Sequence, residues 1–226
     1  TALLESIEGR RGIPRIKPPF PVRNGLYQLP TVVNNVETFA AAAWLLQSGV
    51  AAFRAVGTEQ SPGTRLHSVA GDCERPGIYE LPMAASVQDL LQASGARDPA
   101  LVQLGGPSGV MSGPAEWQQL LAFEGISPGG SVMVFNQSRS HFNIARNFTA
   151  FFQQESCGFC TPCRAGTQVL LRDMDCAAQG HQHADLNALA TLINSTSHCG
   201  LGQTAGRPVL HWLQMNAAQT TEPAHD

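Results

Sequence analysis

Hydrophobic and polar positions follow different periods along this chain, and the changes of period divide it into three stretches. Residues 1–9 have helical spacing. Residues 10–31 then contain five prolines, which exclude both a helix and a central strand, so an extended loop is predicted there. Another helix is predicted after the pair Asn34–Asn35 and ends at Gly49, because Asn favours the N-cap position and Gly favours the C-terminal end.

The middle of the chain has the shorter period typical of strands. Turn residues separate four predicted strands with the sequences RLHSVAGD, GIYELP, LVQLGG and SVMVFN. One helix is predicted to begin at Ser86, where Asp89 completes a pattern similar to a capping box. Together these elements predict a small α+β domain, with a mixed sheet around one helix, over residues 63–137.

Helical spacing returns in the last stretch of the chain. One predicted helix places four large apolar side chains on a single face: Ile144, Phe148, Phe151 and Phe152. We interpret this face as part of a core rather than as a flavin stack. Further helices are predicted to begin at Asp185 and near Pro208, and the tail 217–226 is predicted to fray. Residues 138–226 are therefore expected to form a helical bundle.

Composition limits the class of protein. The chain has 226 residues, of which 43% are hydrophobic and 14% charged, so a sizeable core can form and extensive disorder is not expected. Its 14 basic and 17 acidic residues argue against nucleic-acid binding. No apolar run reaches the roughly 18 residues of a membrane-spanning helix, and no secretion signal is present. We therefore expect a cytoplasmic protein without direct membrane insertion, peripheral to a membrane only through partner subunits.

The cysteines carry most of the candidate chemistry. Three of the six form the run Cys157-x2-Cys160-x2-Cys163, a spacing typical of three ligands to an iron–sulfur cluster. Zinc is favoured less, because it usually takes two separate Cys or Cys/His pairs and a second pair is missing here.

The fourth ligand must come from elsewhere in the chain. Cys199 is the preferred candidate, because the glycines that follow it allow the backbone to approach a bulky inorganic group closely. Cys176 remains an alternative, although it lies on a predicted helix and is interpreted as a partly buried free thiol. His181 and His183 are interpreted as exposed loop residues rather than as a metal-binding pair.

Five motifs occur in the order in which one known family carries them: TALLESIEG, RGIPRIKPPFP, PTVVNNVET, ESCGFCTPCRAG and HCGLG. In these motifs the chain resembles the family of NADH-binding flavoprotein subunits of respiratory complex I. Within that family it is most similar to the diaphorase alpha subunit of NAD-reducing [NiFe] hydrogenases. The family's glycine-rich FMN and NADH loop lies upstream of these motifs and is not present here, so the resemblance is to the C-terminal half.

The resemblance implies an α+β fold in three parts. Residues 1–62 would be the C-terminal part of an FMN- and NADH-binding domain. Residues 63–137 would form a small β-grasp domain of the SLBB type. Residues 138–226 would form a helical domain that holds an iron–sulfur cluster.

The resemblance also implies site residues and a function. One [4Fe-4S] cluster would be held by Cys157, Cys160, Cys163 and Cys199. Asn34 and Asn35, which spacing alone favours as helix caps, would contact FMN. Electrons would enter an NADH-linked oxidoreductase through this subunit, passing from NAD(H) through FMN to the cluster. They would then reach partner subunits that carry further iron–sulfur clusters, such as a small diaphorase or thioredoxin-like subunit.

Two other interpretations stay open. The missing glycine-rich loop favours a non-catalytic iron–sulfur relay or docking module that lacks its own flavin. A zinc-stabilised interaction domain rests on the cysteine count alone. Near the expected cluster, Arg164 is predicted to offset the negative charge of four thiolates and to raise the reduction potential.

Overall fold

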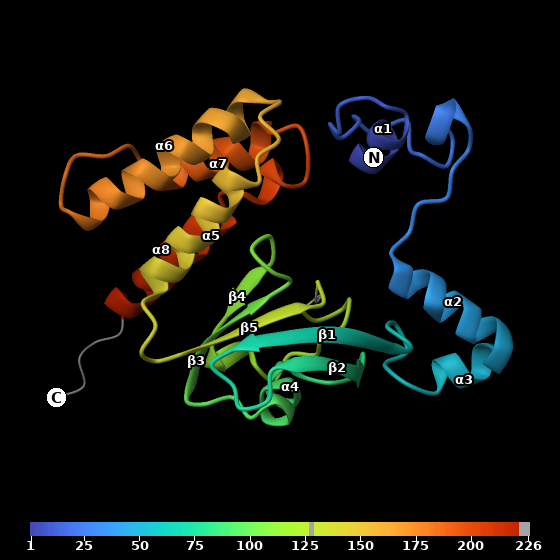
Figure 1. Cartoon of the computed structure of the whole chain (residues 1–226). Coiled ribbons are helices and arrows are strands. Elements are labelled where there is room, and N and C mark those ends of the chain that lie inside the picture. Colours follow the sequence, from blue (N-terminus) through green and yellow to red (C-terminus); the bar gives the residue numbers. More distant parts are fainter. Residues whose placement is uncertain (127–128, 222–226) are drawn as a thin grey trace.

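The computed structural model describes residues 1–126 and 129–221, and it combines one open sheet with several helices (Figure 1). An N-terminal segment of helices and extended chain leads into the sheet, and a bundle of helices follows the sheet along the chain. The expected combination of a sheet with separate helices is confirmed. Within the described part of the chain, no helix is both long and apolar enough to cross a membrane.

The N-terminal segment contains three α-helices and a 3-10 turn. These are α1 (Ala2–Ile7), η1 (Leu26–Gln28), α2 (Val36–Ser48) and α3 (Val50–Arg54). Asn35 caps α2, since its side chain accepts a hydrogen bond of 2.9 Å from the Glu37 amide. Gly49 ends the helix with φ +84°, a conformation that favours glycine. The capping role that spacing predicts for Asn35 and the helix end at Gly49 are confirmed.

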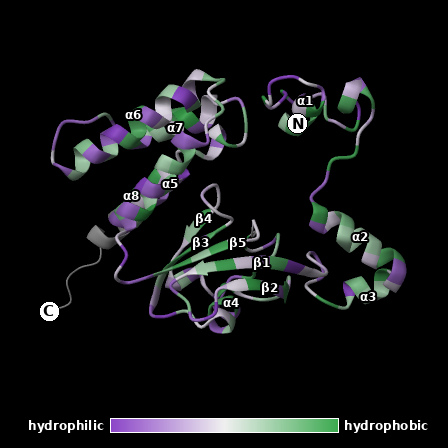
Figure 2. Cartoon of the chain, viewed as in Figure 1, coloured by the Kyte–Doolittle hydropathy of each residue, from purple (hydrophilic) through white to green (hydrophobic). Residues whose placement is uncertain are grey.

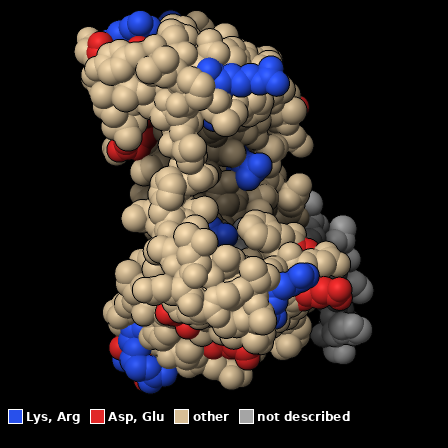
Figure 3. Space-filling model, turned by 90° about the vertical axis from the view of Figure 1, so that its right-hand side faces the viewer, with Lys and Arg blue, Asp and Glu red and all other residues tan. Residues whose placement is uncertain are grey.

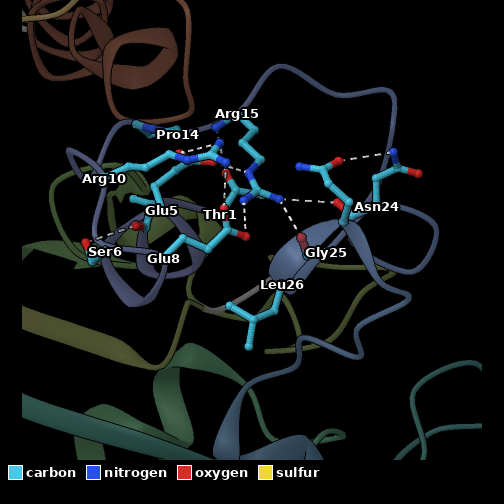
Figure 4. A network of polar contacts seen from close by, with 12 residues as sticks. Thr1, Glu5, Ser6, Glu8, Arg10, Pro14, Arg15, Asn24, Gly25 and Leu26 are labelled. Carbon is cyan, nitrogen blue, oxygen red and sulfur yellow. Dashed lines mark hydrogen bonds and ion pairs between the residues drawn. The ribbon is translucent and has the colours of Figure 1, made fainter.

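A network of polar contacts fastens the proline-rich loop to α1 (Figure 4). The Arg15 guanidinium donates to the Glu8 carboxylate at 2.9 Å and also pairs with Glu5. It donates further to the Gly25 carbonyl at 2.8 Å, while the Arg15 amide donates to Thr1 Oγ1 at 2.9 Å. The loop is thereby held in one place although most of it has no regular secondary structure.

The sheet has five strands in the order β2-β1-β5-β3-β4. The strands are β1 (Thr64–Gly71), β2 (Gly77–Pro82), β3 (Pro99–Leu104), β4 (Val110–Ser112) and β5 (Ser131–Asn136). Strands β1 and β5 are parallel and the other neighbours are antiparallel, so the sheet is mixed, as predicted. Strand β4 is not predicted, because it has three residues and follows the glycine-rich stretch 105–109, which indicates a turn.

Helix α4 (Val87–Ser94) covers one face of the sheet. Its predicted capping box is confirmed: Ser86 Oγ accepts from the Asp89 amide at 3.1 Å, and the Asp89 carboxylate accepts from the Ser86 amide at 2.8 Å. The core beneath it is formed by Val69, Val87, Leu90, Leu91, Val102, Leu104, Trp117, Leu121, Val132 and Val134. This core is closed without any contribution from the N-terminal segment.

Four helices form the bundle. They are α5 (His141–Gln154), α6 (Thr161–Ala178), α7 (Leu186–Thr196) and α8 (Arg207–Thr221). Ile144 and Phe148 of α5 pack against Leu101, which faces away from α4, so the bundle covers part of the other face of the sheet. A separate core joins the four helices through Ala145, Phe152, Leu170, Met174, Leu186, Ala190, Ile193, Ala205 and Val209.

Two details of the bundle differ from the prediction. Phe151 is 40% exposed, so only three of the four apolar residues predicted to share one face of α5 are buried. Helix α8 continues to Thr221, so the first half of the tail predicted to fray is helical. The rest of that tail, 222–226, lies outside the described residues.

Candidate metal centre

Four cysteine thiols from two distant parts of the chain line one cavity of about 200 Å³. They belong to Cys157, Cys160, Cys163 and Cys199. Cys157 is exposed, Cys160 and Cys199 are half-buried, and Cys163 is buried. The structure thus brings together the four residues that the sequence selects as ligands.

The triplet lies on a turn that leads directly into α6. Gly158 adopts φ +75°, a left-handed conformation that lets the chain reverse after Cys157. Cys160 is the N-cap residue of α6, and Cys163 lies in its first turn, after Pro162. Pro162 allows the helix to begin before Cys163, so this cysteine lies on α6 rather than on the turn that carries Cys157.

Cys199 approaches the triplet on the turn between α7 and α8. Gly202 makes this approach possible, since a Cβ atom there would lie 2.5 Å from Ser197 Cβ and 3.1 Å from Cys163 Cβ. Among the described residues that line the cavity, Cys176 is not found, because it lies in the last turn of α6. Geometry therefore favours Cys199 over Cys176 as the fourth ligand.

The sheet supports the Cys199 turn through the glycine-rich stretch 105–109. Thr204 Oγ1 donates to Ser108 Oγ at 3.0 Å, and Arg207 Nη1 donates to the Ser108 carbonyl at 2.8 Å. The prediction leaves this stretch without a role, because these contacts join residues about a hundred positions apart.

The thiols influence one another electrostatically. Burial raises the pKa of the Cys163 thiol, a hydrogen bond of 3.3 Å to Ser156 Oγ lowers it, and the other three cavity thiols raise it again. Thiolates this close repel each other, so a cation among them is what would allow them to ionise together.

The donor set fits a cluster. In the described ranges, no three or more His, Cys, Asp or Glu side chains converge closely enough to hold a single metal ion. The four thiols surround a volume, and most of the other lining residues are apolar: Ala2, Gly12, Pro14, Phe159 and Leu201 lie beside the polar Glu155, Ser156 and His198. Four cysteine thiolates around a largely apolar space are the ligand set of an iron–sulfur cluster.

Two arginines hold the turn that carries Cys157. Arg11 Nη2 donates to the Cys157 carbonyl, and Arg164 Nη1 donates to the Gly158 carbonyl, both at 2.8 Å. The sequence suggests Arg164 because it adjoins the candidate ligand Cys163, whereas Arg11 is missed because it lies 146 positions away from Cys157.

The remaining candidate residues lie elsewhere. Asn34 and Asn35 are exposed where α2 begins, away from the thiol cavity. His181 and His183 are exposed on the connection between α6 and α7, as the sequence predicts.

Comparison with known proteins agrees with this geometry. Residues 143–222 match the family described as the NADH-ubiquinone oxidoreductase-F iron–sulfur binding region. All four cavity cysteines lie inside that range. The predicted family resemblance is confirmed.

Relatives of this iron–sulfur binding region extend the match to the rest of the chain. The chain is 46% identical over 219 residues to the NAD-reducing hydrogenase HoxS subunit alpha of Cupriavidus necator, covering 95% of this chain and 36% of that protein. It is 40% identical over 228 residues to the F subunit of the NADH-quinone oxidoreductase of Streptomyces coelicolor, covering 95% of this chain and 51% of that protein. The chain therefore spans about half or less of the length of these curated relatives.

A solved structure has the same fold over the whole chain. The crystal structure of an NAD+-reducing [NiFe]-hydrogenase in the H2-reduced state matches with a TM-score of 0.89 and 40% sequence identity. The match covers 100% of this chain and 41% of that chain.

Proposed function

We propose that this chain is the cluster-bearing part of the subunit through which electrons enter an NADH-linked oxidoreductase of the hydrogenase, formate dehydrogenase or complex I type. The observation that carries the proposal is the set of four cysteines around one cavity, inside the region that matches the iron–sulfur family. When bound, a [4Fe-4S] cluster would take electrons that NADH delivers through FMN and pass them to partner subunits.

The chain's own residues would hold and stiffen this centre. Cys157, Cys160, Cys163 and Cys199 would be the ligands. Thr167 Oγ1 donates to the Cys163 carbonyl at 2.6 Å within the buried part of α6, and this bond fixes the backbone that carries the ligand. Support of this kind behind the ligands keeps a cluster in one geometry as its charge changes.

We assign the sheet to a β-grasp domain of the SLBB type within residues 63–137. The strand order β2-β1-β5-β3-β4, with one helix across a face, supports this assignment. The helices within 138–226 would then be the iron–sulfur domain.

The N-terminal segment, residues 1–62, is proposed to be the C-terminal part of an FMN- and NADH-binding domain, with Asn34 and Asn35 as flavin contacts. Its surface supports this, because many large apolar side chains are exposed there, including Leu3, Ile16, Val22, Tyr27, Val32, Val36, Trp44 and Leu46. Apolar residues are frequent along α2 (Figure 2). Charged side chains cover only a small part of the face of the molecule that is on the right in Figure 1, where α2 and α3 lie (Figure 3). The rest of the nucleotide-binding domain is the proposed cover for this surface.

Partners and location follow from the same proposal. We expect redox subunits with their own iron–sulfur clusters, such as a small diaphorase or thioredoxin-like subunit, in the cytoplasm. The names of the relatives, which are subunits of hydrogenases and quinone oxidoreductases, support a multisubunit assembly. The alternative is a relay module without its own flavin, and the exposed apolar surface of residues 1–56 is compatible with it.

A chimeric protein tests the proposal. In it, this chain replaces the 219 matching residues of the hydrogenase HoxS subunit alpha, and anaerobic visible spectra are recorded before and after NADH. The chain alone is the matched control. We expect a shoulder near ~400 nm in both proteins, and bleaching by NADH only in the chimera.

Each result distinguishes the interpretations. If NADH bleaches the isolated chain, its nucleotide pocket is complete and the N-terminal segment needs no cover. If the chimera contains both flavin and cluster but NADH reduces only the flavin, the proposed electron transfer from flavin to the cluster of this chain is wrong. A featureless spectrum in both proteins overturns the iron–sulfur assignment.

A further inference from the structure

We propose that residues 11–14, here called the strap, close the thiol cavity on one side, and that His198 and Arg11 are the positioning residues that fasten the strap there. The inference rests on the proposed cluster site. It concerns segments that lie far apart in the sequence, and the strap itself supplies no thiol.

The strap forms part of the cavity wall. Gly12 and Pro14 line the same space as the four cysteines, together with Ala2 of α1. These residues present backbone and small apolar groups, so this side of the cavity offers little to bind water. The strap is therefore a cover over the thiols rather than an additional ligand.

Two hydrogen bonds attach the strap to the two segments that carry the ligands. His198, next to Cys199, contacts the Pro14 carbonyl through Nε2 at 2.7 Å. Because a carbonyl oxygen can only accept, Nε2 is the donor in this contact. Arg11 makes the second attachment through its 2.8 Å bond to the Cys157 carbonyl.

The His198 ring is itself held in place. Phe159 packs edge-on against it, with ring centroids 5.0 Å apart, and Phe159 belongs to the turn between the first two ligands of the triplet. His198 thus touches the strap on one side and the triplet turn on the other. Removing the ring would loosen both contacts together.

The strap has a firm base. Arg15, directly after it, is bound to α1 and to the Gly25 carbonyl (Figure 4). Gly12 lies so close to α1 that a Cβ atom there would be 2.8 Å from Ser6 Oγ. The strap therefore lies between α1, which Gly12 and Arg15 contact, and the ligand turns, which Arg11 and Pro14 contact.

The strap has two consequences for the centre behind it. It limits the access of water and reagents to the half-buried thiols of Cys160 and Cys199. It also limits hydration of the more negatively charged reduced cluster, so detachment of the strap is expected to raise the reduction potential.

Thiol alkylation in the cluster-free chain tests the strap without any activity assay. Iodoacetamide labelling of Cys160, Cys163 and Cys199 would be followed by mass spectrometry in the wild type, His198→Ala and Arg11→Ala. We expect the labelling rate to rise about fivefold in each variant. Loss of one net hydrogen bond increases the population of molecules with a detached strap by about this factor. His181→Ala is the matched control, because His181 is an exposed histidine far from the strap in the sequence.

A conservative variant separates loss of the hydrogen-bond donor from loss of the fold, which circular dichroism measures. His198→Gln retains an amide donor and is expected to restore part of the protection. If His198→Ala loses native circular dichroism, Arg11→Ala decides, because Arg11 is exposed and its loss leaves the core intact. Equal labelling rates in the wild type and the folded strap variants would overturn the proposal.

Failure of the strap and failure of the cluster assignment are distinguishable. After anaerobic reconstitution with iron and sulfide, the potential of His198→Ala is expected to lie above that of the wild type, and that of His181→Ala to match it. An unchanged potential in His198→Ala contradicts the strap alone. A wild type that takes up no cluster contradicts the proposed function, while the labelling pattern still decides whether the strap covers the thiols.

Discussion

The N-terminal segment and the helical bundle contain helices of similar length but bury them very differently. Helix α2 has 13 residues and none of them is buried, whereas α5 has 14 residues and buries five. Leu46 of α2 is 85% exposed, while Phe152 of α5 is fully buried. Because isolated helices of this length are marginal in water, we propose that α2 packs against a surface outside residues 1–126 and 129–221.

This difference separates the two proposed cofactor sites. The four cavity cysteines lie on the bundle, which carries its own core, so cluster binding is expected from this chain by itself. Asn34 and Asn35 lie on the segment with few buried side chains, so flavin binding is expected to need the covering surface proposed for α2.

The largest expected effect is at the ligands. Cys163→Ser removes the buried member of the four proposed ligands, and nearly all the absorbance near ~400 nm should be lost after reconstitution. Cys176→Ser is the matched control, since this thiol lies at the other end of α6 and its loss should leave the spectrum unchanged. Equal spectra for the two variants would contradict the ligand assignment.

The contrast in burial predicts a contrast in stability. Phe152→Ala should lower the free energy of unfolding by about 3–5 kcal/mol, because it empties a closed core. Leu46→Ala should change it by about 0.5 kcal/mol or less, because the side chain is already in water. Urea unfolding of both variants measures the difference, and a large loss for Leu46→Ala would show that α2 is already covered.

Acid should weaken the closed sheet through His67. The His67 side chain is 1% exposed, and no partner of its Nδ1 atom is found among the described residues. Burial lowers its pKa, and the charge of Arg65 lowers it further, against the opposing charge of Glu37. The unfolded chain therefore binds a proton first, and stability present above pH about 6.5 is lost as the pH falls below it.

The dependence of the free energy of unfolding on pH tests this acid sensitivity. One buried neutral histidine contributes a slope of at most about 1.4 kcal/mol per pH unit, and urea unfolding between neutral pH and about pH 5 measures it. His67→Leu should flatten this dependence, whereas the exposed His181→Leu should leave it as in the wild type. Identical slopes in all three proteins would show that His67 is not held neutral.

The smallest expected effect is electrostatic. Arg164→Ala removes a positive charge that is held beside the ligand turn by its bond to the Gly158 carbonyl, so the midpoint potential should fall. The expected fall in potential is below about 60 mV, the shift that corresponds to a tenfold change in the equilibrium constant of a one-electron reduction. Arg97→Ala, on the sheet domain, is the control, and an unchanged potential in Arg164→Ala would rule out this role.

Local signals in the sequence were sufficient for much of the fold. Asn35, Ser86 and Asp185 each cap the helix that their position predicts, because a cap depends on neighbours within three residues. Cys199 could be selected from the glycines beside it, and Gly202 is indeed needed for its approach.

Features that depend on contacts between residues far apart in the sequence could not be predicted. His198 meets Pro14 across 184 positions, and no local pattern indicates this contact. Strand β4 pairs with β3 despite the glycines before it, because pairing and burial outweigh weak local propensity. Phe151 fits the helical period of α5, yet the neighbouring elements do not cover it.

The central claim is that this chain binds a cluster without any further protein, whereas its N-terminal segment needs further protein to bind flavin. Its most direct test is the iron, acid-labile sulfide, zinc and flavin content of the anaerobically purified chain. We predict about four iron and four sulfide per chain with little flavin. Zinc in place of iron, or a full complement of flavin, would contradict the claim.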